Sequence, residues 1–70
     1  MNTPLKIARK RKNLTLMQVA ELIKSDAGNI SRIERGQQTP SKELVEKLVA
    51  LFKDEGLTEL HILFPERYTD

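Results

Sequence analysis

The first half of the chain is rich in basic side chains, whose ammonium and guanidinium groups bind polyanions. Residues 1–36 contain eight Lys and Arg residues against three Asp and Glu residues, a charge of +5. Residues 37–70 contain four basic and seven acidic residues, a charge of −3, which gives +2 for the whole chain. This asymmetry favours a nucleic acid on one side of the molecule, with a solvated basic face as the alternative.

The residue types that most catalytic sites require are scarce in this chain. It has no cysteine, which excludes thiolate nucleophiles, thiolate metal sites and disulfides. His61 is the single histidine, and the sequence contains neither a glycine-rich phosphate loop nor a cluster of metal ligands. We therefore expect a protein without enzyme activity and without a cofactor, metal or small-molecule ligand.

Segments that direct a chain to a membrane are also missing from the sequence. No apolar run approaches the roughly 20 residues needed to span a bilayer. The first residues lack the apolar stretch of a secretory signal. We expect a cytoplasmic protein without membrane contact.

Apolar spacing in the seventy residues predicts one all-α domain. The pattern is clearest where Leu16, Val19, Ala20 and Ile23 fall at i, i+3, i+4 and i+7. We expect five short helices, at about residues 4–12, 16–23, 27–35, 42–52 and 58–64. Pro65 prevents continuation of the last helix, so residues 1–65 form the domain and residues 66–70 a polar tail.

Capping residues stand at the expected helix boundaries. Thr15 and Gln18 have the spacing of a capping box, in which each side chain bonds the other's backbone amide. Asn13 tolerates the left-handed conformation that ends many helices, and Gly36 is suited to the same role. The other expected N-caps are Thr3, Asp26 and Ser41. Two short helices joined by a turn of three or four residues give a helix-turn-helix arrangement.

Three blocks of residues share the spacing of one protein family. They are Leu14-Thr15, Val19-Ala20 and Ile30-Ser31-Arg32-Ile33-Glu34-Arg35-Gly36, and they follow one another without a gap relative to the family. On these blocks the chain resembles the Cro/phage-repressor (XRE-like) helix-turn-helix family, over roughly residues 5–64. The resemblance implies a compact five-helix lambda-repressor-like DNA-binding domain with its helix-turn-helix motif at about residues 15–35.

The same resemblance assigns roles around the recognition helix, residues 27–35, which enters the major groove in this family. Arg32 is the strongest candidate for a base contact, because arginine donates two hydrogen bonds to guanine O6 and N7. The other base contacts implied are Ala27, Gly28 and Ser31. Asn29 is expected to contact a base or a phosphate. The phosphate contacts implied are Gln18, Ser25, Arg35, Gln37, Gln38 and Ser41.

The resemblance also carries expectations about structure and assembly. Arg9 and Glu34 match a family pair that forms a structural salt bridge. Lys24 stands where the family usually has the glycine of the turn, so this turn must tolerate a side chain. Small relatives often pair through the last helix or through the strand or tail after it, which makes Leu60, Phe64 and Tyr68 candidates for a dimer interface. We expect a homodimer on a two-fold symmetric operator in double-stranded DNA.

These observations predict a sequence-specific DNA-binding transcriptional regulator. The simplest form is a small Cro-like or stand-alone phage-type repressor that acts by occupying its operator. The alternative is a protein-interaction module of the same fold, such as an antitoxin or an adaptor. Three apolar residues at positions that are usually polar in the family favour this alternative: Leu16, Met17 and Leu22.

Overall fold

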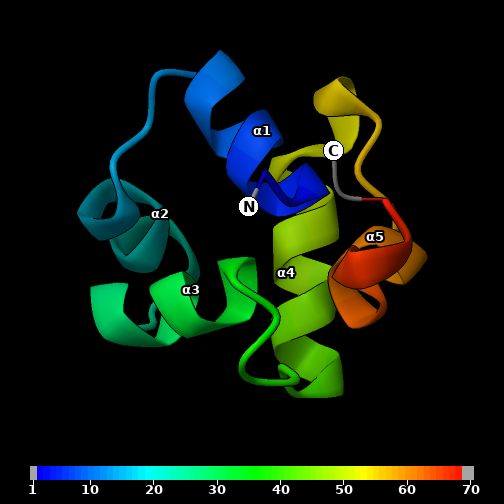
Figure 1. Ribbon diagram of the computed structural model, residues 1–70. Coiled ribbons are helices and arrows are strands. Elements are labelled where there is room, and N and C mark those ends of the chain that lie inside the picture. The colour runs from blue at the N-terminus through cyan, green and yellow to red at the C-terminus, as the bar shows by residue number, and fades with distance from the viewer. Residues whose placement is uncertain (1, 69–70) are drawn as a thin grey trace.

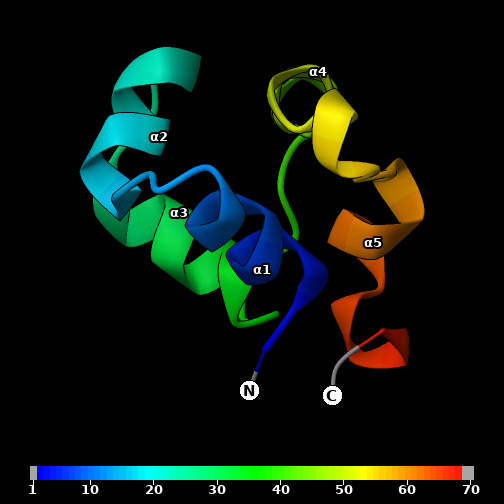
Figure 2. The ribbon, with the colours of Figure 1, turned by 90° about the horizontal axis from the view of Figure 1, so that it is seen from above.

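The computed structural model describes residues 2–68, which form five α-helices and two turns of 3-10 helix. No strand occurs among these residues, and the predicted all-α fold is confirmed. The helices are α1 (Pro4–Arg11), α2 (Leu16–Ile23), α3 (Ala27–Glu34), α4 (Lys42–Leu51) and α5 (Glu59–Leu63). In Figure 1, α2 and α3 lie on one side of α4 and α5 lies on the other. Figure 2 shows α1 between α3 and α5.

The helices begin where capping side chains stand. The residue before each α-helix accepts a hydrogen bond from the amide of the third helical residue, and these N-caps are Thr3, Thr15, Asp26, Ser41 and Thr58. Thr15 and Gln18 form the predicted capping box, with N···O distances of 2.8 and 3.1 Å. Asn13 has the predicted positive φ, 55°, and Gly36 has a φ of 73°. Capping chemistry therefore sets the start of each α-helix.

The ends of the helices differ from the sequence expectation in small ways. Helices α1, α3, α4 and α5 end one residue earlier than predicted, and the C-cap residues that follow them are Lys12, Arg35, Phe52 and Phe64. Lys53–Glu55 and Pro65–Arg67 form turns of 3-10 helix, η1 and η2, which periodicity did not predict. Three-residue helices are too short to show an apolar repeat. A Cβ added to Gly36 would lie 3.3 Å from Pro65 Cγ, so η2 packs against the end of α3.

One apolar core joins all five α-helices. Val19, Ile30, Leu48 and Phe52 are completely buried within it. The remaining buried apolar residues are Leu5, Ala8, Ala20, Ile23, Ile33, Val45, Leu57 and Ile62. Leu16, which was predicted to face the core, is half-buried and packs against it. Because the core holds both α2 and α3, it fixes the angle of the helix-turn-helix motif.

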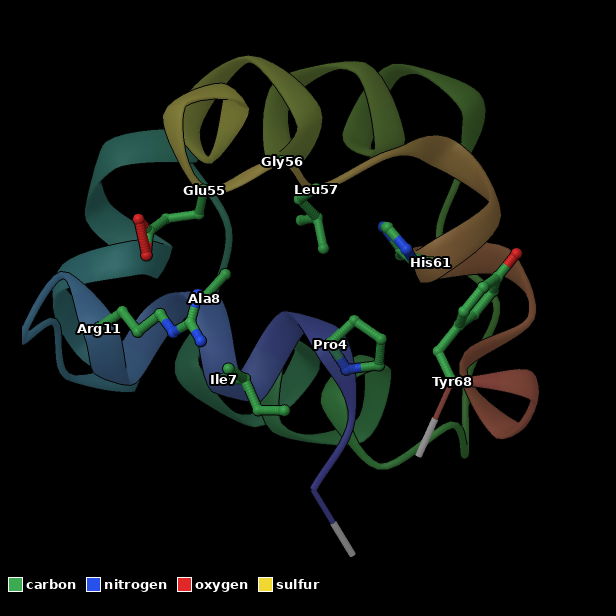
Figure 3. A pocket seen from close by; sticks show the side chains of 9 residues that line it. All are labelled: Pro4, Ile7, Ala8, Arg11, Glu55, Gly56, Leu57, His61 and Tyr68. Atoms are coloured by element: carbon green, nitrogen blue, oxygen red, sulfur yellow. The ribbon is translucent and has the colours of Figure 1, made fainter. Parts of the chain in front are cut away.

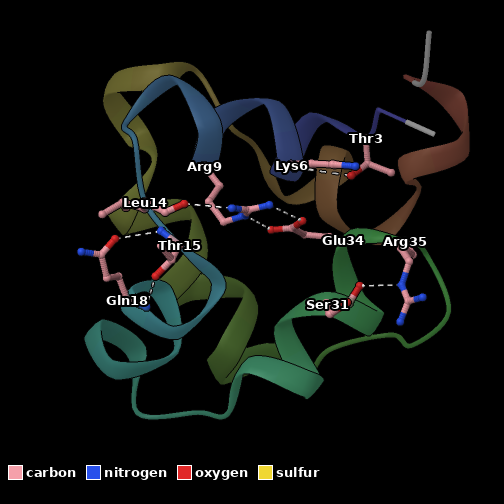
Figure 4. Close-up of polar contacts among 9 residues, drawn as sticks. All are labelled: Thr3, Lys6, Arg9, Leu14, Thr15, Gln18, Ser31, Glu34 and Arg35. Atoms are coloured by element: carbon pink, nitrogen blue, oxygen red, sulfur yellow. Dashed lines mark hydrogen bonds and ion pairs between the residues drawn. The ribbon is translucent and has the colours of Figure 1, made fainter.

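Arg9 and Glu34 form an ion pair between α1 and the end of α3, as Figure 4 shows. Arg9 Nε lies 2.5 Å from Glu34 Oε2, and Arg9 Nη2 donates to Glu34 Oε1 at 3.3 Å. Arg9 Nη1 donates to the carbonyl oxygen of Leu14 at 2.8 Å. The two side chains are only 12% and 5% exposed. One guanidinium therefore joins α1, the end of α3 and the segment that leads into α2.

Replacing Arg9 with alanine is expected to lower the free energy of unfolding by about 3–5 kcal/mol, because Glu34 would keep a buried charge without a partner. Urea denaturation followed by circular dichroism measures this change. Arg11→Ala is the matched control, since Arg11 lies on the same helix and is exposed. A loss for Arg9→Ala no larger than for Arg11→Ala would contradict the structural role of the pair.

Candidate nucleic-acid interface

Helices α2 and α3 form the helix-turn-helix, and their junction depends on one strained residue. Lys24, the C-cap of α2, has φ 57° and ψ 50°, the left-handed conformation that glycine adopts most easily. The turn therefore keeps a glycine-type backbone although it carries a lysine side chain. Asp26 then caps α3, and its Oδ1 accepts a hydrogen bond from the backbone amide of Asn29 at 2.7 Å. The junction thus sets where α3 begins.

Helix α3 presents one side to the core and another to solvent. Ile30, Ile33 and Glu34 are buried. Arg32 and Gly28 are exposed and lie four residues apart, on the same face of the helix. Ala27, Asn29 and Ser31, the other predicted contacts on the helix, are half-buried. The structure leaves the Arg32 side chain open to a partner.

Arg32 belongs to a chain of hydrogen bonds that links the loop after α3 to the turn before it. Its Nε donates to Gln38 Oε1 at 2.9 Å. Gln38 Nε2 donates in turn to Asn29 Oδ1. Asn29 Nδ2 donates to Ser25 Oγ at 3.0 Å. Four residues that the sequence assigned separately to bases and phosphates therefore form a single unit.

The Arg32 guanidinium lies beside Gly28 at the start of α3. A Cβ built on Gly28 would be 3.5 Å from Arg32 Nη1, which is ordinary van der Waals contact. The same Cβ would lie 3.2 Å from Asp26 Oδ1, a tighter approach. The guanidinium thus points back toward the N-terminus of its own helix, as long helical side chains do.

The remaining predicted phosphate contacts lie at several helix ends. Ser41 caps α4 and shares a small hollow with Ser25, so the start of α4 lies beside the turn of the motif. Gln18 lies at the start of α2, where its side chain is part of the capping box. Arg35 follows α3 and donates from Nε to the Ser31 carbonyl oxygen at 3.3 Å (Figure 4). Arg35 and Gln18 are therefore not part of the hydrogen-bonded unit around Arg32.

Two basic groups of the first half, Arg9 and Lys12, already have acidic partners within the domain. Arg9 is paired with Glu34, and Lys12 Nζ donates to both carboxylate oxygens of Asp54 at 3.0 and 2.8 Å. The hydrogen bond from Lys12 lowers the pKa of the Asp54 carboxyl group. Lys10 and Arg11 are exposed at the end of α1. The number of basic residues in this half is therefore larger than the number of basic side chains that remain unpaired for binding a polyanion.

An open hollow of about 290 Å³ lies between α1 and the C-terminal segment (Figure 3). Its lining includes Arg11, Glu55, His61 and Tyr68. The His61 Nδ1 accepts from the Thr58 amide at 3.0 Å, and its ring meets that of Tyr68 edge-on, 4.5 Å between centroids. His61 therefore serves as a cap of α5. Within residues 2–68 no group of three or more His, Asp or Glu side chains is placed to hold a metal ion.

Comparison with known proteins assigns the family. A family model described as a helix-turn-helix domain matches residues 4–54, which include the whole of α1 to α4. The chain belongs to the helix-turn-helix domain family. No match was found among curated proteins or among solved structures. The helix-turn-helix is a DNA-binding unit whose second helix lies in the major groove. In this chain the second helix of the motif is α3.

The helix-turn-helix domain contains one site feature that sequence reasoning did not anticipate. Gln38 was predicted to contact phosphate, and its side chain also forms hydrogen bonds with Arg32 and Asn29, which were not predicted. Gln38 lies in an irregular loop, where no periodicity indicates which side chains meet.

Among the described residues, no helix has the length and apolar character needed to cross a membrane.

Lys24→Gly is expected to stabilise the helix-turn-helix domain by about 0.5–1 kcal/mol. A non-glycine residue in the left-handed region costs about 1–3 kcal/mol, and the added freedom of glycine in the unfolded chain offsets part of this gain. Chemical denaturation measures the change. Lys24→Ala removes the same charge but keeps a Cβ, so it should bring no comparable gain. Equal stabilisation by both variants would show that the loss of the lysine charge, and not the backbone conformation, causes the effect.

Proposed function

We propose that this helix-turn-helix domain is a sequence-specific transcriptional regulator, most simply a small Cro-like or phage-type repressor that acts by occupying its operator. Helix α3 lies in the major groove and reads bases through Arg32. Exposed groups around the motif, including Gln37 and Ser41, contact phosphates. Operator occupancy excludes other proteins from the same DNA, and this mode of action requires no catalytic group.

The observation that carries the proposal is that the Arg32 side chain, on the solvent face of α3, is exposed and keeps hydrogen-bond donors for a partner. Its side chain is exposed, and its side-chain hydrogen bond within the described residues, to Gln38, uses Nε. Both terminal nitrogens therefore remain available as donors, and guanine presents two acceptors, O6 and N7, in the major groove. The opposite side of α3 is buried in the core, which holds the helix while its outer face binds.

We propose that the domain binds DNA as a homodimer through the region of α5. Leu60 is 51% exposed, and Phe64 and Tyr68 are also exposed at this end of the molecule. A two-fold symmetric pair places two recognition helices about one DNA turn, 34–36 Å, apart. This spacing lets two short helices read one operator with the affinity of both.

Selection from random duplexes, read by sequencing at about 150 mM salt, tests the proposed function while phosphate attraction is partly suppressed. The expected product is a two-fold symmetric site with half-sites about one helical turn apart. Weak, salt-sensitive binding without any enriched sequence would contradict a sequence-specific regulator.

Arg32→Ala is expected to weaken the selected site by about 1–3 kcal/mol and to relax the preference at one base pair of each half-site. The cause is the loss of a bidentate contact to guanine. Competition binding against single-base variants of the site measures both effects. Arg11→Ala removes an exposed charge from α1 and is the control. An equal loss on every sequence would make Arg32 a phosphate contact instead.

Leu60→Lys is expected to shift the domain toward monomer, because a charge would be placed in an apolar interface. Sedimentation at increasing protein concentration, with and without the selected duplex, measures the shift. Met17→Lys is the control, since Met17 is exposed on α2, away from α5. Unchanged sedimentation of Leu60→Lys relative to wild type would exclude this interface.

A second candidate function is a protein-interaction module, such as an antitoxin or adaptor. Met17 and Leu22 on α2 are 67% and 59% exposed, which favours an apolar contact with another protein. Leu16 packs against the core and leaves only two of the three predicted residues at the surface. This candidate predicts stable association with a protein and little sequence preference on DNA.

A further inference from the structure

We infer that Gln38 is a positioning residue for base recognition: it fixes the Arg32 guanidinium so that its two terminal nitrogens address guanine in the major groove. The inference rests on the proposed function and deepens it, since it names the base that α3 reads and the loop residue that enforces the choice. Gln38 was predicted to contact phosphate, and its hydrogen bonds indicate a different role.

The chemistry of the groups permits only one arrangement of this unit. A guanidinium carries donors alone, so the Gln38 atom that faces Arg32 Nε must be the carbonyl oxygen. The Gln38 amino group then faces Asn29 and requires an acceptor there, the Asn29 carbonyl oxygen. The Asn29 amino group is thereby directed to Ser25 Oγ. Each amide fixes the orientation of the next.

The bond from Arg32 Nε determines which contacts remain for DNA. An arginine can bind guanine side-on, through Nε and one terminal nitrogen, or end-on, through both terminal nitrogens. Gln38 occupies Nε and so leaves the end-on fork. One nitrogen of this fork, Nη1, lies beside the exposed Gly28, 3.5 Å from the position of an added Cβ.

Preorganisation is the physical advantage of this arrangement. Arginine loses much rotamer freedom when it is immobilised at an interface. In this domain the hydrogen bond to Gln38 restricts the side chain before DNA arrives, so less freedom is lost on binding. The restriction also disfavours contacts to other bases that a freely rotating guanidinium would reach. Gln38 therefore raises the preference for guanine more than it raises affinity for DNA in general.

Gln37 offers a matched control within the same loop. It is the same residue type, it is exposed, and it directly precedes Gln38. Its backbone amide donates to the Arg32 carbonyl oxygen at 2.9 Å, whereas no side-chain hydrogen bond of Gln37 is formed with the described residues. Removal of either glutamine side chain changes the loop composition equally, but only one removal frees Arg32.

The test compares Gln38→Ala, Gln37→Ala and Arg32→Ala on the selected site and on its variants with guanine replaced at each position. Gln38→Ala is expected to lower the preference for guanine at the Arg32 base pair about five- to tenfold, in line with the net contribution of one typical intramolecular hydrogen bond. Gln37→Ala should weaken all duplexes nearly equally. In the Arg32→Ala background, Gln38→Ala should leave the preference at that base pair unchanged.

A uniform loss of affinity for Gln38→Ala, equal to that for Gln37→Ala, would overturn the inference and make Gln38 a phosphate contact. Gln38→Met keeps the length of the side chain without its acceptor and must reproduce the loss of preference, or the effect belongs to loop packing. Failure of the wild-type domain to select any site would reject the proposed function itself. The two failures are therefore distinct.

A measurement without DNA provides an independent readout. The Arg32 Nε–H proton should exchange with solvent more slowly in the wild-type domain than in Gln38→Ala, because a hydrogen bond protects it. Heteronuclear NMR of arginine side chains measures this exchange, and circular dichroism establishes that each variant is folded. Equal exchange rates in the two proteins would show that Gln38 does not restrain Arg32.

Discussion

The buried ion pair between Arg9 and Glu34 is the constraint on which the rest of the structure depends. Glu34 lies at the end of α3, and Arg9 comes from α1, 25 residues earlier. The same guanidinium bonds the carbonyl oxygen of Leu14, which leads into α2. The pair therefore adds a polar link between three elements that the apolar core also packs together. Within the described chain no buried side-chain polar atom lacks a hydrogen-bond partner, so this polar centre is fully satisfied.

The ion pair anchors one end of α3 and leaves the other end for recognition. Helix α3 has eight residues, about 12 Å of helix. Glu34 is buried at its C-terminal end, whereas Gly28 is exposed in its first turn. A second polar unit, from Arg32 through Gln38 to Asn29, ties the loop after α3 to this exposed surface. The domain thus uses one network to place the helix and another to orient the side chain it presents.

Local rules predict much of this fold from the sequence. The capping box of Thr15 and Gln18 and the positive φ of Asn13 follow from the chemistry of neighbouring residues, and the structure shows both. The apolar repeat of α2 identifies the side that packs on the core. These features involve residues only a few positions apart, where side-chain geometry is fixed by the helix itself.

The parts that sequence reasoning missed depend on contacts between distant or irregular segments. Nothing in the sequence indicates that Gln38, rather than Gln37, meets Arg32, because loop geometry decides between neighbours. The 3-10 turn Pro65–Arg67 packs against Gly36, nearly 30 residues away along the chain, and such a contact leaves no periodic signal. The charge count of each half also did not predict which basic groups are paired, because Lys12 binds Asp54 in the other half of the chain.

The central claim, that α3 reads guanine from the major groove, is tested most directly by dimethyl sulfate protection of the selected duplex. This reagent methylates guanine N7 in the major groove and adenine N3 in the minor groove, and the two acceptors lie in different grooves. The account predicts protection of one guanine N7 in each half-site by the wild-type domain and its loss in Arg32→Ala. Protection confined to adenine N3, or guanine N7 protection that persists in Arg32→Ala, would contradict it.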